Sequence, residues 1–205
     1  MIELFESPFF HLGHYEIQFK NRGQQVGVCE RCRSFGSPAD VLAYDINEIH
    51  KQVTNAGARA MLWGDLLIDP ALDGGNVNGE AGEVFRAVDR VPRDLLITDW
   101  HYTPAENYHS NEFFIEKGFD VTGAVWFSMP GISAYTQHAR QSGAGGMIMT
   151  TWCRPDPTQL PLTSILYAAQ CFTQPSVPCP DDPNLERQLR VEAERLWQRW
   201  REWST

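Results

Sequence analysis

Short apolar runs alternate with stretches of helical periodicity along this chain, and the first apolar run covers residues 5–12. A short run of this composition predicts a buried strand. The sequence then passes through a glycine and becomes polar at His14, Tyr15 and Glu16. A buried strand with polar residues at its end is typical of the strands of a (β/α) barrel, which carry functional side chains at their C-terminal rim.

The clearest helix signal follows the loop at residues 21–36. Ser37 is a suitable N-cap, and Pro38 occupies the first helical position. Apolar residues then recur at roughly helical spacing until Gly57. The pattern predicts a helix over residues 38–53.

The same alternation continues to the C-terminus. Buried strands are expected at residues 58–62, 94–98, 120–127 and 147–151. Helical segments are expected at 84–88, 110–117 (capped by Ser110 and ended by Gly118), 132–141, 160–172 and 184–203.

Strands that alternate with helices predict a parallel sheet covered by helices. We count about five βα units, so the predicted fold class is α/β, a partial (β/α)8 TIM-type barrel, with a C-terminal amphipathic helix. The predicted domain covers residues 1–175. Residues 176–205 would form a proline-rich break and an amphipathic helix packing on that domain, with Leu185, Leu189, Leu196, Trp200 and Trp203 on its apolar side. Trp197, Trp200 and Trp203 would be a helix-docking face or a partner surface.

Composition narrows the range of partners. The 205 residues are 42% hydrophobic, with 17 basic and 26 acidic residues and a formal net charge of -9. Because there is no stripe of Lys and Arg, we expect neither nucleic acid nor an anionic membrane as partner. The sequence lacks a long apolar run and a signal peptide pattern, so we expect a cytoplasmic protein.

Five cysteines, an odd number, do not predict a disulfide framework. Cys29 and Cys32 form a CxxC pair, but a structural zinc site needs four ligands and no second pair follows. We therefore expect two thiols in a loop and no metal. A redox function for the pair is an alternative, disfavoured because a polar loop precedes it where thioredoxin-type pairs follow a strand.

Candidate chemistry gathers where the predicted strands end. These positions hold Glu16, Trp63, Asp65, Asp99, Trp100, Tyr102 and Trp152. Sugars present flat C–H faces to aromatic rings and hydroxyl groups to carboxylates, so such a ring of residues favours a carbohydrate site. The alternative for any single tryptophan is simple packing under a loop.

The residues His11-Leu12-Gly13-His14-Tyr15-Glu16 resemble the His-x-Gly-x-Asp-Glu motif that ends the fourth barrel strand of family 20 glycoside hydrolases, the β-N-acetylhexosaminidases. The resemblance is nearest to the hexosaminidase D-like branch. The Cys29-x-x-Cys32 loop, the sequence Leu-Trp-Gly-Asp at 62–65 and Thr-Thr-Trp-x-Arg-x-Asp at 150–156 follow in the expected order.

This resemblance implies a mechanism. Glu16 would be the general acid that protonates the glycosidic oxygen. In the family the preceding aspartate orients the 2-acetamido group of the substrate, whose carbonyl oxygen is the nucleophile. Such substrate-assisted, retaining hydrolysis uses no metal or organic cofactor and is an exception to the two-carboxylate scheme.

The chain departs from the family pattern in two ways. Tyr15 occupies the aspartate position, and a phenol carries no charge near neutral pH. This indicates a different sugar, a weaker enzyme or a binding-only relative, unless Asp65 or Asp99 supplies the charge. The match also begins at the fourth barrel strand, so we expect a fragment of a longer protein, with completion by a second copy as the alternative.

The resemblance and the strand-end pattern assign a role to each residue. Glu16 would be kept protonated by the apolar rings of Phe9, Phe10 and the tryptophans. His11 and His14 would hold a hydroxyl group or orient Glu16. Trp152 would be the floor of the sugar subsite and Trp63, Trp100 and Trp126 its walls. The candidates for hydroxyl contacts are Asp65, Tyr102, Arg154 and Asp156; the last two are alternatively a surface ion pair.

Overall fold

The computed structural model describes residues 2–16, 30–72, 78–79, 81–152, 161–174, 176, 178 and 180–203. These residues form two compact units. The first comprises residues up to 100 together with 109–122, and the second comprises 101–108 together with residues from 123 onward. The boundary between the units falls inside a strand.

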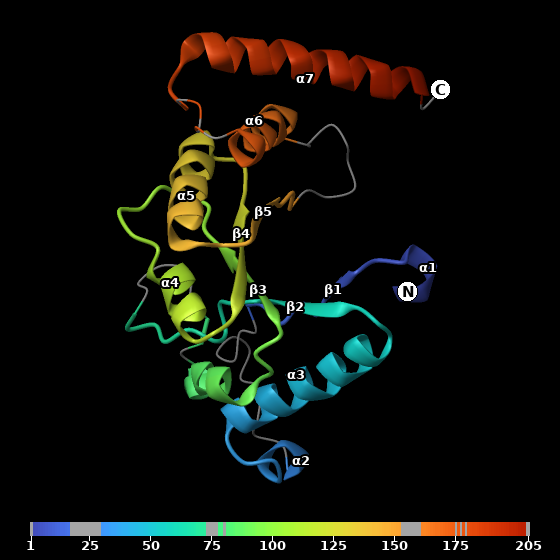
Figure 1. Ribbon diagram of the computed structural model, residues 1–205, viewed down its shortest axis with the longest axis vertical. Helices are drawn as coiled ribbons and strands as arrows, with labels where there is room; N and C mark the ends of the chain where they lie inside the picture. Colours follow the sequence, from blue (N-terminus) through green and yellow to red (C-terminus); the bar gives the residue numbers. More distant parts are fainter. Residues whose placement is uncertain are drawn as a thin grey trace. The chain divides into compact units, whose positions relative to one another are not determined.

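Helices and strands alternate along the chain, as Figure 1 shows. In chain order, the elements up to that boundary strand are α1 (Ile2–Phe5), β1 (Phe9–His11), α2 (Glu30–Arg33), α3 (Pro38–Asn55), β2 (Arg59–Trp63), the 3-10 helix η1 (Ala81–Arg90), β3 (Leu96–Trp100), α4 (His109–Glu116) and β4 (Asp120–Val125). The elements that follow are α5 (Met129–Ser142), β5 (Gly146–Met149), α6 (Leu162–Thr173) and α7 (Pro183–Trp203).

The described strands form one sheet in the order β1-β2-β3-β4-β5. β1 and β2 are parallel with Phe10 opposite Ala60, and β2 and β3 are parallel with Leu62 opposite Ile97. Sequential order and parallel pairing result when each strand returns through a helical crossover. The predicted fold class, a partial α/β barrel with a C-terminal helix, is confirmed.

In the first unit, α3 begins as its sequence predicts. The Ser37 hydroxyl accepts a hydrogen bond from the Asp40 backbone N–H, and the Asp40 carboxylate accepts one from the Ser37 N–H, which completes a capping box. α3 then packs against β2 and η1 with Leu42, Ile46 and Val53 buried. The core that results holds β2 and β3 in place.

The expected first strand is wrong in extent and burial. Only Phe9–His11 is strand, residues 2–5 are helical, and the Phe9 side chain is 44% exposed. Pro8 has no N–H for a ladder hydrogen bond, so pairing with β2 begins at its carbonyl, which accepts from Arg59 N–H at 2.8 Å. β1 also lies at the edge of the described sheet, where a strand is covered less than in the middle.

Ser110 is not the N-cap of the following helix, because α4 begins at His109. The Ser110 hydroxyl points inward and donates to the Asp99 carboxylate at 2.9 Å. The helix expected at residues 132–141 also begins earlier than predicted: Ser128 caps α5 through a hydrogen bond from Gly131 N–H, with Pro130 in the first turn.

In the second unit, α7 packs on α6, and Leu189 is buried together with Ala193. The apolar side of α7 is covered unevenly, because Leu196 is 37% and Trp200 46% exposed. α7 has 21 residues and α6 only 12, so at about 1.5 Å per residue α7 is far longer than the helix beneath it. Trp197 and Trp200 stack on each other, with ring centroids 5.0 Å apart.

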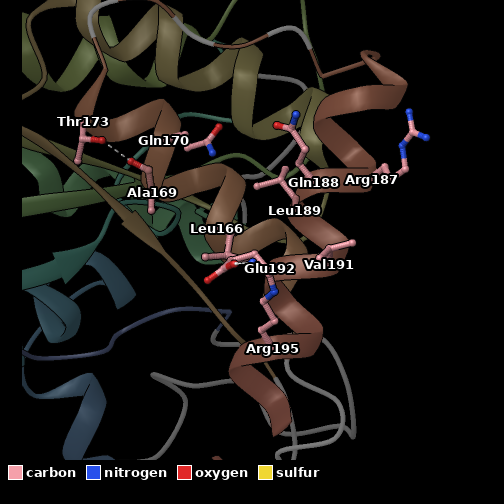
Figure 2. A pocket seen from close by; sticks show the side chains of 10 residues that line it. All are labelled: Leu166, Ala169, Gln170, Thr173, Arg187, Gln188, Leu189, Val191, Glu192 and Arg195. Atoms are coloured by element: carbon pink, nitrogen blue, oxygen red, sulfur yellow. Dashed lines mark hydrogen bonds and ion pairs between the residues drawn. The ribbon is translucent and has the colours of Figure 1, made fainter. Parts of the chain in front are cut away.

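A groove of about 650 Å³ lies between α6 and α7 (Figure 2). Its lining includes the apolar residues Leu166, Ala169, Leu189 and Val191 and the charged residues Arg187, Glu192 and Arg195. None of the predicted sugar-binding residues lines this groove. No helix among the described residues is long and apolar enough to cross a membrane.

Candidate functional site

The turn that follows β1 has an unusual backbone. Gly13, His14 and Glu16 all have positive φ angles, of 78°, 57° and 47°. This conformation suits glycine but costs on the order of 1–3 kcal/mol at each other residue. His14 and Glu16 therefore adopt it only because surrounding contacts hold them there.

His11 is the last residue of β1, and its ring is held at both nitrogens. Nδ1 accepts from the Gly13 N–H at 3.0 Å, so the neutral ring carries its proton on Nε2 and donates to Thr98 Oγ1 at 3.2 Å. Burial, with a smaller effect of the His14 charge, lowers the pKa of His11 from 6.5 to about 4. His11 is thus a neutral residue near pH 7 that links β1 to β3.

His14 holds the turn from the other side. Its Nδ1 faces the Leu12 carbonyl at 3.1 Å, and its Nε2 lies 2.7 Å from Asp45 Oδ2 on α3. Both partners are acceptor oxygens, so each ring nitrogen of His14 faces an acceptor. This arrangement anchors residue 14 to α3 and gives it an orienting role in the turn.

Asp65 is a buried carboxyl group of the first unit, with 3% of the residue exposed. Its Oδ2 accepts from the Glu16 backbone N–H at 3.0 Å and from Asn78 Nδ2 at 2.7 Å. Burial raises the pKa of Asp65, while hydrogen bonds from Glu16 N–H, Asn78 and the Trp100 side chain act in the opposite direction. Asp65 and Trp100, predicted separately, are therefore neighbours.

The expected shielding of Glu16 from water is not found. The Glu16 side chain is exposed, and Phe9, which was expected to cover it, is itself 44% exposed. The rings at the strand ends therefore leave the Glu16 side chain exposed. The buried carboxyl group next to this turn is that of Asp65, which follows β2.

Tyr15 and His11 both contact the indole of Trp63. The Trp63 ring centroid lies 4.8 Å from that of His11 and 6.1 Å from that of Tyr15, the latter in an edge-to-face arrangement. Trp63 is nearly buried, whereas Tyr15 is 45% exposed. Trp63 therefore packs against His11 and Tyr15 and leaves little of its own ring exposed to a ligand.

On β3, Asp99 is 5% exposed and accepts from Ser110 Oγ at 2.9 Å. This buried contact with α4 gives Asp99 a structural partner within the first unit. Thr98, one residue earlier, is fully buried and meets His11. The structure thus brings His11, Tyr15, Glu16, Trp63, Asp65 and Trp100 together by contacts around β1, β2 and β3.

A second group of predicted residues meets in the second unit. The Trp152 indole N–H donates to the Tyr102 hydroxyl at 2.9 Å, and the rings of Tyr102 and Trp126 meet edge to face at 5.6 Å. Each of the three follows a strand end, after β3, β4 and β5. Trp152 is 46% exposed, so this aromatic trio has a ring surface accessible to a ligand.

Some predicted residues lie outside the described part of the chain. These are Arg154, Asp156 and Cys29, so the predicted hydroxyl contacts and the CxxC pair stay predictions. Cys32 is half-buried and lies in α2. Among the described residues, no group of three His, Cys, Asp or Glu side chains is arranged to hold a metal ion.

Three contacts of the site were not predicted: Asp45 with His14, Asn78 with Asp65, and Thr98 with His11. Thr98 directly precedes Asp99, so a strand-end pattern extended by one residue would have included it. Asp45 lies within the helical pattern of α3, and Asn78 lies in a loop. Nothing in the local sequence distinguishes them from solvent-exposed residues.

Comparison with known proteins shows a likeness of fold. The chain is similar to the β-N-acetylhexosaminidase of Bacteroides fragilis NCTC 9343, with a TM-score of 0.56 and 14% identity over 97% of this chain. It is also similar to a family 20 exo-β-N-acetylglucosaminidase of Vibrio harveyi solved with N-acetylglucosamine, with a TM-score of 0.52 and 14% identity over 96% of this chain. The chain spans 42% and 33% of the length of these two proteins.

No protein-family model matches the sequence, and no curated protein matches it either. At 14% identity the two structures establish a glycosidase-like α/β fold for this chain. They do not extend to the hexosaminidase D-like branch or to an activity.

Proposed function

We propose that this chain is a glycoside hydrolase of the β-N-acetylhexosaminidase type that removes a terminal hexosamine with retention of configuration. The fold likeness and the motif resemblance at residues 11–16 support the reaction class. The observation that carries the proposal is the turn after β1, where Glu16 follows two residues held by side-chain contacts and has its own N–H bound to Asp65. Backbone strain of this kind clusters at functional sites.

In the proposed reaction Glu16 begins as a carboxylic acid. It transfers its proton to the glycosidic oxygen while the carbonyl oxygen of the substrate's 2-acetamido group attacks the anomeric carbon and the leaving group departs. The Glu16 carboxylate then takes a proton from water, which opens the cyclic intermediate at the same carbon. The exposed position of Glu16 requires the bound sugar itself to exclude water from the carboxyl group.

The aromatic trio Tyr102, Trp126 and Trp152 would supply the stacking surface for sugar in the second unit. Trp152 has the exposed ring that such stacking needs. Carbohydrate is the partner that the proposal requires. Completion of the barrel by a preceding half or by a second copy stays a prediction.

A second candidate function is carbohydrate binding without turnover. It is favoured by Tyr15, which places an edge-to-face ring against Trp63 where the resemblance calls for an aspartate. A neutral phenol does not stabilise a developing cation as a carboxylate does. On this reading the aromatic surface is kept and the chemistry is lost.

Hydrolysis of a chromogenic N-acetylglucosaminide tests both candidates. For the enzyme, we expect turnover by the wild type and a loss of at least about 100-fold in Glu16→Gln, because general acid catalysis contributes about 10²–10⁴-fold. Glu6→Gln is the matched control, since Glu6 is also an exposed glutamate with a positive φ. Turnover that is unchanged in Glu16→Gln would contradict the role of Glu16, and turnover that appears only in Tyr15→Asp favours the binding relative.

Binding of N-acetylglucosamine measured by calorimetry tests the aromatic trio separately. We expect Trp152→Ala to weaken binding about tenfold, because stacking on one ring contributes on the order of 1 kcal/mol. Trp200→Ala is the control, since Trp200 on α7 is exposed to the same extent, 46%. Equal effects of both substitutions would contradict a specific role for Trp152.

A further inference from the structure

We propose that Asp65 is the positioning residue that holds Glu16 in its left-handed backbone conformation. The inference rests on the proposed function for its catalytic meaning, while the contact itself is independent of that function. Asp65 was predicted as a ligand for sugar hydroxyl groups. Its burial and its hydrogen bonds indicate that it acts on the protein's own turn.

The first argument is the direction of the hydrogen bonds. Asp65 Oδ2 accepts from Glu16 N–H at 3.0 Å, so it binds the backbone of the residue proposed as the acid. The φ angle of Glu16 is 47°, and this angle sets the direction in which the Cα–Cβ bond leaves the backbone. Loss of the hydrogen bond would allow φ to relax to negative values and turn the carboxyl group away.

The second argument is that Asp65 is itself held firmly. Asn78 donates to Asp65 twice, through its side chain to Oδ2 at 2.7 Å and through its backbone N–H to the Asp65 carbonyl at 2.8 Å. The preceding Gly64 donates to the Thr98 carbonyl, and a Cβ atom at position 64 would lie 2.7 Å from the Phe114 ring. The strand end therefore has no room to shift and can act as a fixed support.

The third argument concerns charge. Burial raises the pKa of the Asp65 carboxyl, whereas the Glu16 N–H, Asn78 and the Trp100 side chain favour its ionised form. Glu16 is the titratable side chain attached to the contacting backbone, and His14 of the same turn is paired with Asp45. The chemical shift of the Glu16 amide proton should therefore depend on the protonation of Asp65. The measurement needs a side chain at position 16 that does not titrate.

A spectroscopic test follows from this. In the Glu16→Gln variant the side chain at position 16 does not titrate, and the NMR shift of the residue 16 amide proton should follow the titration of Asp65. We expect the Asp65 inflection above the usual range of an aspartate. It should persist in Glu16→Gln/Asp69→Asn and vanish in Glu16→Gln/Asp65→Asn, whereas any contribution from other groups of the turn is common to all three variants. A pH profile that Asp65→Asn leaves unchanged would overturn the contact.

Asp69 serves as the control because it follows the same strand and its carboxylate accepts from a nearby backbone group, the Ala71 N–H, at 2.9 Å. Asp65→Asn keeps an oxygen that can accept from Glu16 N–H and nearly the same side-chain size. It can therefore be tested even if Asp65→Ala does not fold. A folded state is checked for each variant by near-UV circular dichroism.

A kinetic test then separates positioning from substrate binding. With the chromogenic substrate, we expect Asp65→Ala to lower kcat about tenfold or more with KM changed less than twofold, and Asp65→Asn to recover part of kcat. A raised KM with unchanged kcat would make Asp65 a substrate contact and overturn the proposal. If the wild type shows no turnover, the proposed function fails while the amide titration still decides the contact.

Discussion

His11 illustrates how much a single side chain reveals at the residue scale. A histidine at a strand end was predicted to hold a hydroxyl group or orient Glu16, and the structure gives it Thr98 and Gly13 as partners. Those partners come from β3 and from the turn, so no local pattern around residue 11 specifies them. The kind of residue at the strand end was predictable, but the contacts that set its protonation state were not.

This protonation state predicts a pH dependence of stability. The pKa of His11 is about 4 in the folded protein and about 6.5 when unfolded, so between these values the unfolded chain binds more protons. The free energy of unfolding should therefore rise with pH from about 4 to 6.5 and then level off. Because the ring is only partly buried, we expect about 1–2 kcal/mol from this residue.

Urea unfolding of the wild type and His11→Gln between pH 4 and 8 measures this difference. The variant should lack that part of the rise. His109→Gln is the control, since His109 is exposed. Within the described chain, its ion-pair partner is Glu112, at 3.8 Å. Parallel pH profiles for the wild type and His11→Gln would show that His11 is not held neutral in the folded state.

At the element scale, local signals predicted the bounds of α3 more closely than the ends of the strands. Ser37, Pro38 and Gly57 delimit α3 as expected, because capping and helix termination depend on neighbouring residues. β3 instead runs two residues further than predicted, to Trp100. The end of a parallel strand depends on how far the neighbouring strand continues. The strand's own sequence carries no information about that neighbour.

The capping box of α3 gives a test at this scale. Ser37→Ala removes the side-chain acceptor for the Asp40 N–H, and we expect a loss of about 1 kcal/mol in the free energy of unfolding. Ser34→Ala is the control, since the exposed Ser34 hydroxyl bonds to the Arg31 carbonyl outside the cap and should change stability by less than about 0.5 kcal/mol. Equal losses in both variants, measured by denaturant unfolding, would refute a special role for the cap.

At the scale of the whole molecule, the alternation of strands and helices sufficed to predict the fold class. Parallel pairing and sequential strand order follow from that alternation. The candidate site was predictable only as a set of residues at strand ends. The division into a group around Asp65 and a group around Trp152 depends on turns and side-chain contacts that no periodic pattern encodes.

The attachment of α7 gives the last prediction. The apolar stripe of this helix is continuous in the sequence, yet Leu189 is 3% exposed in the core of the second unit while Leu196 is 37% exposed. Leu189→Ala should lower the free energy of unfolding by about 2–4 kcal/mol, because it removes buried methyl groups and leaves a cavity. Leu196→Ala should cost less than about 1 kcal/mol. Denaturant unfolding followed by circular dichroism compares the two. Similar losses in the two variants would mean that the second half of α7 is covered in solution as fully as the first half. The contrast between the two leucines therefore decides whether α7 is packed along its whole length or only over its first turns.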